Sequence, residues 1–194
     1  MTGGILLTGG TSARMGVDKA TLLVGGVTLA ERVGELLAAA VALAVEVGRG
    51  TSHLATTLEQ PPGAGPLAAV AAGHAALVER GLGADVPCLV VACDLPLLSA
   101  AVLDRLVAYA GHWSVLPVID GHAQPLCARW SAEDLAAAPL ALAAGERSLR
   151  GLPDRRQAVL LDEAYWGADA GCFLDVDAPS DLRRLGLAAP DGSP

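Results

Sequence analysis

The sequence is poor in aromatic residues, which make up 3% of its 194 residues and include a single Phe, while hydrophobic residues make up 53%. A core of this composition consists mainly of Ala, Leu and Val, so we expect alanine-rich helices packed closely on a sheet rich in Val and Leu. This composition is typical of a globular chain and excludes a disordered one. The length suits one domain with a full core, so we expect a single domain over residues 1–194, with residues 188–194 as a frayed tail.

Basic residues are also few, because 13 Lys and Arg stand against 21 Asp and Glu, for a net charge of −8. A general nucleic-acid or membrane-surface binder would carry the opposite sign, so we expect neither partner. An anionic small substrate is still allowed, because a local group of Arg side chains and backbone N–H groups can oppose the overall charge. No apolar run reaches the roughly 18 residues of a membrane span, and no basic region precedes the first apolar segment, which disfavours a signal peptide. We therefore expect a cytoplasmic protein.

The sequence has no C-x-x-C pair among its four cysteines, Cys88, Cys93, Cys127 and Cys172. This absence disfavours a zinc site and favours reduced thiols in or near the core of a cytosolic protein.

Short apolar runs alternate with segments of helical periodicity along the chain. We expect strands at residues 4–9, 41–48, 87–94, 113–119, 124–130 and 173–179, and helices at 28–40, 66–81, 99–109, 131–144 and 147–152, with a closing helix after residue 179. Thr28 and Ser99 are suited to open helices, and Pro66 suits a first helical turn. This alternation predicts a three-layer α/β/α sandwich with a Rossmann-like, mostly parallel sheet, in which ligands collect at the carboxyl ends of the strands.

The first predicted strand ends in a glycine-rich turn, "LLTGGTSARMGVDK", at residues 6–19. Its spacing fits neither the Walker A pattern nor the dinucleotide-binding fingerprint. Backbone N–H groups around residues 9–12 can face a triphosphate because little side chain blocks the approach. Arg14 offers a planar donor fork for phosphate oxygens, and Lys19 offers a mobile point charge. The alternative interpretation is a tight strand–helix turn with two solvated cations.

The clearest predicted strand, residues 87–94, ends in Asp94. An unpaired carboxylate there would be costly to desolvate, and Mg²⁺ bridging phosphate oxygens would compensate it. The alternative is that Asp94 caps the following helix or turn. Asp175 and Asp177 alternate on the expected late strand and should therefore point to opposite faces, so we expect at most one of them to share the metal. A solvated acid or a helix cap is the alternative for both.

The glycine-rich turn resembles the signature LAGGxSxRMGxDK of the nucleoside triphosphate transferases related to molybdenum cofactor guanylyltransferase. Three further segments agree with that family in order along the chain: "PGAGPLAAV" at 62–70, "ACDLPLL" at 92–98 and "FLDVDAPSDL" at 173–182. The segment "QPLCARW" at residues 124–130 is a weaker fifth match. The resemblance covers nearly the whole chain and implies the nucleotide-diphospho-sugar transferase type of fold, over one nucleotidyltransferase domain.

The resemblance also assigns roles to individual residues. It places Glu59 where the family carries an aspartate that accepts hydrogen bonds from guanine, and Asp177 in register with the second asparagine of an Asn-Ile-Asn segment. Aspartate at both late positions departs from that family pattern, and Ala69 replaces a family glycine. The catalytic residues are then Arg14, Lys19 and Asp94, and the metal ligands Asp94 and Asp177. The nucleotide-binding residues are Thr8, Gly9, Gly10, Thr11, Ser12, Arg14, Lys19, Glu59, Gly65, Pro66 and Leu67.

The activity implied by the resemblance is Mg²⁺-dependent transfer of GMP from GTP to the phosphate of molybdopterin or the molybdenum cofactor, with release of pyrophosphate. Gly10 in "TGG" favours guanine, because the cytidylyl relatives usually read Ala-Gly there. A cytidylyltransferase of the same cofactor, a guanylyltransferase of another phosphorylated small molecule, and a non-catalytic nucleotide- or partner-binding homologue are the alternatives. The implied partners are GTP and the phosphorylated acceptor, and docking to a molybdoenzyme or a cofactor-handling protein stays open.

Overall fold

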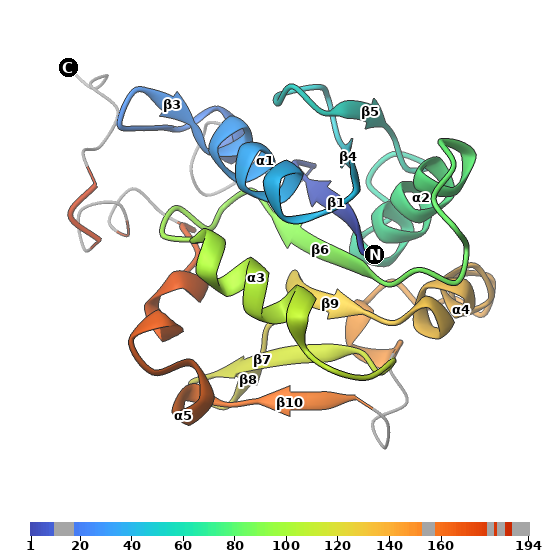
Figure 1. The fold of residues 1–194 in the computed structure, drawn as a ribbon. Coiled ribbons are helices and arrows are strands. Elements are labelled where there is room, and N and C mark those ends of the chain that lie inside the picture. The colour runs from blue at the N-terminus through green and yellow to red at the C-terminus, as the bar shows by residue number, and fades with distance from the viewer. Residues whose placement is uncertain (10–17, 153–157, 178–180, 182–184, 188–194) are drawn as a thin grey trace.

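A computed structural model describes residues 1–9, 18–152, 158–177, 181 and 185–187, and shows one central sheet between two layers of helices (Figure 1). The strands of the main sheet are β1 (Gly3–Leu7), β4 (Leu43–Val47), β5 (Ala55–Thr57), β6 (Cys88–Ala92), β7 (Val115–Ile119), β8 (His122–Ala123), β9 (Cys127–Trp130) and β10 (Val159–Leu161). Their order is β10-β7-β9-β6-β1-β4-β5, and β8 pairs with β7. A separate small hairpin joins β2 (Leu23–Val24) to β3 (Val27–Thr28).

The sheet is mixed, with a parallel core. Strand β1 is parallel to its neighbours β4 and β6, β4 is parallel to β5, and β10 is parallel to β7. Strand β9 runs antiparallel to both β6 and β7. The predicted α/β sandwich with a mostly parallel sheet is therefore confirmed, with β9 as the reversed strand. The core strands β1 and β6 are buried along almost their whole length, as expected for strands covered on both faces.

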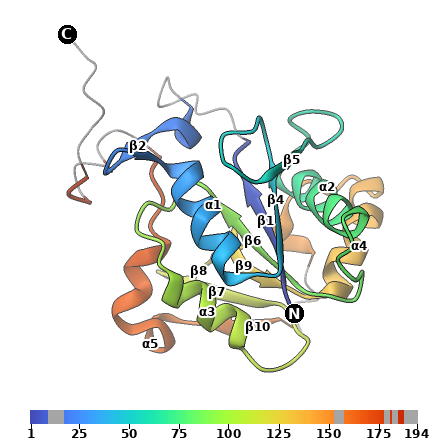
Figure 2. The same cartoon turned by 45° about the horizontal axis from the view of Figure 1, so that its top comes forward.

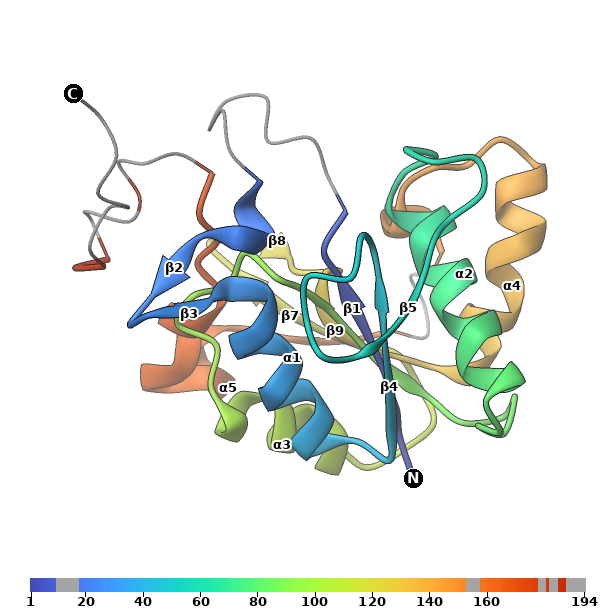
Figure 3. The same cartoon turned by 90° about the horizontal axis from the view of Figure 1, so that it is seen from above.

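Helices cover both faces of the sheet (Figures 2 and 3). The helices are α1 (Leu29–Ala40), α2 (Pro66–Glu79), α3 (Ala100–Ala108), α4 (Ala132–Ala143) and α5 (Glu163–Trp166), with 3₁₀ turns η1 (Lys19–Thr21), η2 (Leu149–Gly151) and η3 (Gly167–Phe173). Figure 3 shows α2 and α4 together on one side of the sheet and α1, α3 and α5 on the other. Each face accordingly has its own apolar core of buried side chains.

The helix starts follow the predicted signals. The side chains of Thr28, Ser99 and Ser131 each accept a hydrogen bond from a backbone N–H in the first turn of α1, α3 and α4. Pro66 opens α2, where its missing N–H costs nothing because that group would have no partner in the helix. Local polar chemistry therefore determines where these helices begin.

The late strand predicted at residues 173–179 is wrong as far as the structure describes that segment. Phe173 ends η3, and residues 174–177 follow without regular structure. The N–H of Val176 donates to the carbonyl of Asp94 at 3.0 Å, so the segment attaches to the loop after β6 instead of to a strand edge. Aspartates are poor strand formers, which agrees with this outcome. Residues 178–180 lie outside the described residues, as does most of the expected closing helix.

The segment from α5 to η3 is held on α3 by Arg105. Its guanidinium lies 4.5 and 4.7 Å from the ring centroids of Tyr165 and Trp166, and it pairs with Asp169 at 2.9 Å. It also donates to the backbone carbonyls of both aromatic residues. These contacts orient the chain as it returns toward the end of β6.

All four cysteines are free thiols, and burial raises the pKa of Cys93 to about 12, so this neighbour of Asp94 carries no thiolate at neutral pH. Across the described part of the chain, no helix combines the length and the apolar character needed to cross a membrane.

Candidate active site

Lys19, Asp94 and Asp177 meet at the carboxyl edge of the sheet, although they are far apart in the sequence. Asp94 follows the end of β6, and Lys19 opens η1. The ammonium of Lys19 donates to Asp94 Oδ2 at 2.9 Å and to Asp177 Oδ1 at 2.6 Å. The side chains of Lys19 and Asp94 are about four-fifths buried, whereas that of Asp177 is 57% exposed. The structure therefore brings together two predicted catalytic residues and both predicted metal ligands.

Local contacts fix the backbone on each side of this cluster. The carboxylate of Asp18 accepts from the N–H of Ala20 at 3.0 Å and so caps η1, which begins with Lys19. The N–H of Cys93 donates to the carbonyl of Leu7 at 3.1 Å, which ties the loop after β6 to the end of β1. The motif residues Asp18 and Lys19 thus have different roles: Asp18 caps η1, and Lys19 binds the carboxylates of Asp94 and Asp177.

The electrostatics of Lys19 favour the charged ammonium. Partial burial lowers the pKa of Lys19, but the hydrogen bonds and negative charges of Asp177 and Asp94 outweigh this effect and raise it overall. Lys19 is the only lysine of the chain. A permanently charged, mobile cation therefore stands between two carboxylates.

Asp175 joins the same cluster. Asp94, Asp175 and Asp177 each offer a carboxylate oxygen, and these oxygens lie within 4.8 Å of one another. The expectation that Asp175 and Asp177 point to opposite faces is wrong, because residues 174–177 do not form a strand and strand alternation does not apply. Burial, followed by repulsion from Asp177 and Asp94, raises the pKa of Asp175.

The donor set suits a hard divalent cation. Three carboxylates with one ammonium leave a net charge of −2 when all three acids are ionised. Carboxylate oxygens are the ligands that Mg²⁺ and Mn²⁺ take in proteins, and such metals bind through one or two carboxylates together with substrate phosphates. Asp94 and Asp177 therefore fit the predicted metal, although Lys19 now holds an oxygen of each.

The other residues predicted to bind the nucleotide lie on the loop before α2, at Glu59 and Gly65, and in the first turn of α2, at Pro66 and Leu67. Glu59 is partly exposed, and its carboxylate accepts from the N–H of Gly63 at 2.9 Å. Gly65 has a φ of +100° and a Cβ there would lie 3.2 Å from the carbonyl of Arg147, so the turn itself requires glycine. The side chain of Leu67 is fully buried in the core, and its N–H donates to the same carbonyl of Arg147.

The start of the glycine-rich turn is described as far as Gly9. Thr8 is buried, and its hydroxyl donates to Glu46 at 2.6 Å. Gly9 is exposed, and among the described residues the nearest atom to a Cβ at this position would be the carbonyl oxygen of Val47, 3.9 Å away. The other residues predicted in this turn fall outside the described residues: Gly10, Thr11, Ser12 and Arg14.

Sequence reasoning missed Glu46, which is fully buried in β4 beside the end of β1. Its signal was a single glutamate in an otherwise apolar strand, directly before the turn "GRGTS" at residues 48–52, which is rich in glycine and hydroxyl groups. Sequence reasoning also did not place the carboxylate of Asp175 beside those of Asp94 and Asp177.

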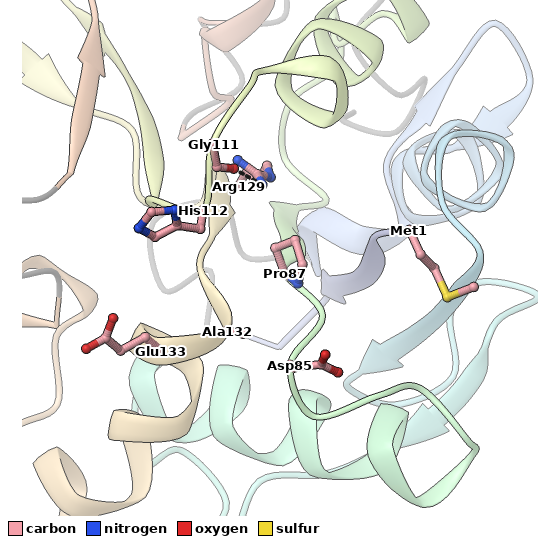
Figure 4. A pocket seen from close by; sticks show the side chains of 8 residues that line it. All are labelled: Met1, Asp85, Pro87, Gly111, His112, Arg129, Ala132 and Glu133. Carbon is pink, nitrogen blue, oxygen red and sulfur yellow. Dashed lines mark hydrogen bonds between the residues drawn. The ribbon is translucent and has the colours of Figure 1, made fainter.

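A cavity of about 450 Å³ lies at the opposite end of the sheet (Figure 4). Its walls include Met1, Pro87, His112 and Arg129, which lie near the amino ends of β1, β6 and β7 and at the end of β9. The buried guanidinium of Arg129 donates to the carbonyls of Gly111 and Trp113 and so supports the loop before β7. None of the predicted site residues lines this cavity.

Comparisons with known proteins identify the family of this chain. The model of the MobA-like NTP transferase domain matches residues 4–159. A molybdenum cofactor guanylyltransferase of Xanthomonas euvesicatoria pv. vesicatoria is 34% identical, over 97% of this chain and 96% of that protein. Another protein of that name, from Cereibacter sphaeroides, is 33% identical over 93% of each chain.

A solved structure has the same fold. It is the molybdopterin-guanine dinucleotide biosynthesis protein A of Archaeoglobus fulgidus, with a TM-score of 0.74 and 24% identity, and the match covers 94% of this chain and 96% of that one. The family match spans most of the chain, including Lys19 and Asp94, and the curated relatives extend the match beyond Asp177. This chain therefore belongs to the MobA-like NTP transferase family.

Proposed function

We propose that this chain transfers GMP from GTP to the phosphate of molybdopterin in the molybdenum cofactor. The acceptor phosphate oxygen attacks the α-phosphorus of GTP, the bond from that phosphorus to the bridging oxygen breaks, and its electron pair leaves with pyrophosphate. The observation that carries the proposal is the cluster of Lys19, Asp94 and Asp177 at the carboxyl edge of the sheet, where parallel sheets bind ligands. The activity named for the full-length relatives supports it.

This reaction makes modest demands on the protein. A phosphate nucleophile is already ionised at neutral pH, so no strong general base is needed. Lys19 has the mobility and the retained charge to follow the negative charge that develops on the transferred phosphate. Gly9 is exposed and has no side chain, which would let a triphosphate approach the backbone closely.

Asp94 and Asp177 are the residues that would hold Mg²⁺ with the nucleotide. When bound, the ion would neutralise phosphate charge and orient the triphosphate. Lys19 must then release at least one carboxylate, and the triphosphate gives its ammonium a new anionic partner. Asp175 adds negative charge to the same place and keeps the cluster acidic after Lys19 leaves.

Glu59 is proposed to select the base. The N1–H and N2–H₂ edge of guanine presents two donors, and a carboxylate is a matching acceptor, whereas cytosine offers a different pattern on its pairing edge. Glu59 lies on the loop before α2, and only one of its oxygens is used in the contact with Gly63. The remaining oxygen and the partial exposure of the side chain leave room for a base.

The base preference is tested by thermal unfolding with Mg²⁺-GTP and Mg²⁺-CTP. We expect GTP to bind at least about tenfold more tightly than CTP, because hydrogen bonds to a charged group contribute about 1.5–3 kcal/mol each. Glu59→Gln should remove most of this difference by weakening GTP and not CTP. Glu79→Gln, the same change at an exposed position of α2, is the matched control. Equal stabilisation of the parent protein by GTP and CTP would overturn the guanine assignment.

A further inference from the structure

Glu46 is a fully buried carboxylate that binds six donors. Its Oε1 accepts from the hydroxyl of Thr8 at 2.6 Å, from the N–H groups of Gly50 and Thr51 at 2.9 Å each, and from the hydroxyl of Thr51 at 3.1 Å. Its Oε2 accepts from the N–H and the hydroxyl of Ser52 at 2.8 and 2.7 Å. Every one of these donors belongs to one of two segments, the end of β1 and the turn at residues 48–52.

Burying a charge is costly unless it is paired or fully hydrogen-bonded. Among the described residues, Glu46 has no cationic partner, and the groups that compensate its charge there are these six donors. Burial raises the pKa of Glu46, but the hydrogen bonds from Thr8, Thr51 and Ser52 outweigh it and lower the pKa overall. The group is therefore an ionised carboxylate at neutral pH, held by neutral donors.

The turn at residues 48–52, which Glu46 holds by hydrogen bonds, packs closely between Thr8 and helix α1. A Cβ on Gly48 would lie 1.9 Å from the hydroxyl oxygen of Thr8, so only glycine allows this approach. On the other side, Ser52 lies against Gly34 of α1, where an added Cβ would be 3.1 Å from the Cβ of Ser52. His53 is tied to Glu31 of α1 through its N–H and its ring. Glu46 and its turn thus have a fixed position relative to α1.

We propose that Glu46 is a positioning residue for nucleotide binding, and that it acts through Thr8. Thr8 is the last buried residue before Gly9, and the glycine-rich turn continues from there. Its N–H donates to the carbonyl of Val47 at 3.2 Å and its hydroxyl donates to Glu46, so the residue that directly follows β1 is fixed from two neighbouring positions of β4. This arrangement sets the direction in which the backbone enters the turn. The inference rests on the proposed GTP binding.

A purely structural role would make the carboxylate important for stability alone. The structural role and the positioning role can be tested separately, because one of the six hydrogen bonds of Glu46 comes from Thr8 and the other five come from the turn at residues 48–52. Breaking the bond to Thr8 should disturb the entry to the glycine-rich turn, whereas breaking one bond to Ser52 should not. Both hydroxyls make short contacts to the same carboxylate, and that of Ser52 also accepts from the N–H of Leu54 at 3.3 Å, so Ser52→Ala should cost stability at least comparable to that lost in Thr8→Val.

The experiment compares three variants of the full chain, Thr8→Val, Thr8→Ser and Ser52→Ala. Calorimetry with Mg²⁺-GTP gives the dissociation constant, and urea unfolding gives the stability. We expect Thr8→Val to weaken GTP binding by about tenfold, the equivalent of one hydrogen bond to a charged group. Thr8→Ser keeps the hydroxyl and should bind GTP more tightly than Thr8→Val does. Ser52→Ala should lose stability comparable to Thr8→Val and bind GTP within about twofold of the parent.

Each outcome bears on a different claim. If Thr8→Val is destabilised to the same degree as Ser52→Ala but binds GTP like the parent, Glu46 is structural and the inference is wrong. If all variants lose affinity in proportion to lost stability, the inference is equally wrong. If the parent itself binds no GTP, the proposed function fails instead. Glu46→Gln, which removes the charge, should reproduce the affinity loss of Thr8→Val wherever it remains folded.

Discussion

Replacing Asp94 by Asn should lower the rate of pyrophosphate release from GTP by about a hundredfold to a thousandfold, the usual loss when a charge-stabilising group is removed from an active site. Asp94 is the least exposed carboxylate of the cluster and closely follows the central strand β6, so its position is the best defined of the three. The amide keeps the size of the side chain but removes its charge. A metal bound with the nucleotide would then lose its anionic ligand.

The control for this variant is Asp104→Asn, the same chemical change at an exposed position of α3. It should release pyrophosphate at the parent rate. Thermal unfolding of both variants checks that the loss is not due to unfolding. If Asp94→Asn kept the parent rate with acceptor present, the carboxylate of Asp94 would have no part in the reaction, and only its backbone carbonyl, which accepts from the N–H of Val176, would matter.

Lys19→Met should change metal binding and turnover in opposite directions. Without nucleotide, the ammonium of Lys19 satisfies Asp94 and Asp177, and a divalent ion must compete with it. Removing that positive charge should tighten Mn²⁺ binding to the nucleotide-free protein by at least about tenfold, because each 1.4 kcal/mol of lost repulsion is a factor of ten. Turnover should fall by about a hundredfold or more, because no cation then follows the transferred phosphate.

Electron paramagnetic resonance of Mn²⁺ measures the first effect directly, without any need for activity. Lys19 is the only lysine of the chain, so protein labelled with ¹³C-lysine gives one side-chain ε-carbon signal. That signal should shift when Mg²⁺-GTP is added, as the ammonium moves from carboxylates to phosphate. Unchanged Mn²⁺ affinity in Lys19→Met would mean that Lys19 and the metal do not share these carboxylates.

Local signals predicted much of this structure. Thr28, Ser99 and Pro66 mark helix starts because capping depends on residues within one turn. Asp94 was predicted at the ligand-binding edge because a buried strand followed by an acid is visible in the sequence. The resemblance to the family identified Lys19 and Asp177 as motif residues. The spacing of these two residues in the sequence does not predict that they lie together.

The features that were missed depend on contacts between distant segments. Strand β9 is antiparallel because it returns from β7 through the β8 hairpin, and strand–helix alternation gives no direction for such a return. Asp175 faces the cluster because Val176 binds the loop of Asp94, which prevents regular strand pairing. Glu46 is buried and charged because its donors come from Thr8, 38 residues earlier, as well as from its own turn.

The most direct test is the reaction itself, with purified protein, Mg²⁺, molybdenum-bound molybdopterin and either GTP or CTP. The proposed function predicts one pyrophosphate released for each GMP transferred, a guanine dinucleotide as the product, and a much slower reaction with CTP. It also predicts no product when the acceptor phosphate is absent, because that phosphate is the nucleophile. Equal rates with GTP and CTP, or no pyrophosphate from GTP with acceptor in excess, would contradict guanylyl transfer at the Lys19–Asp94–Asp177 cluster.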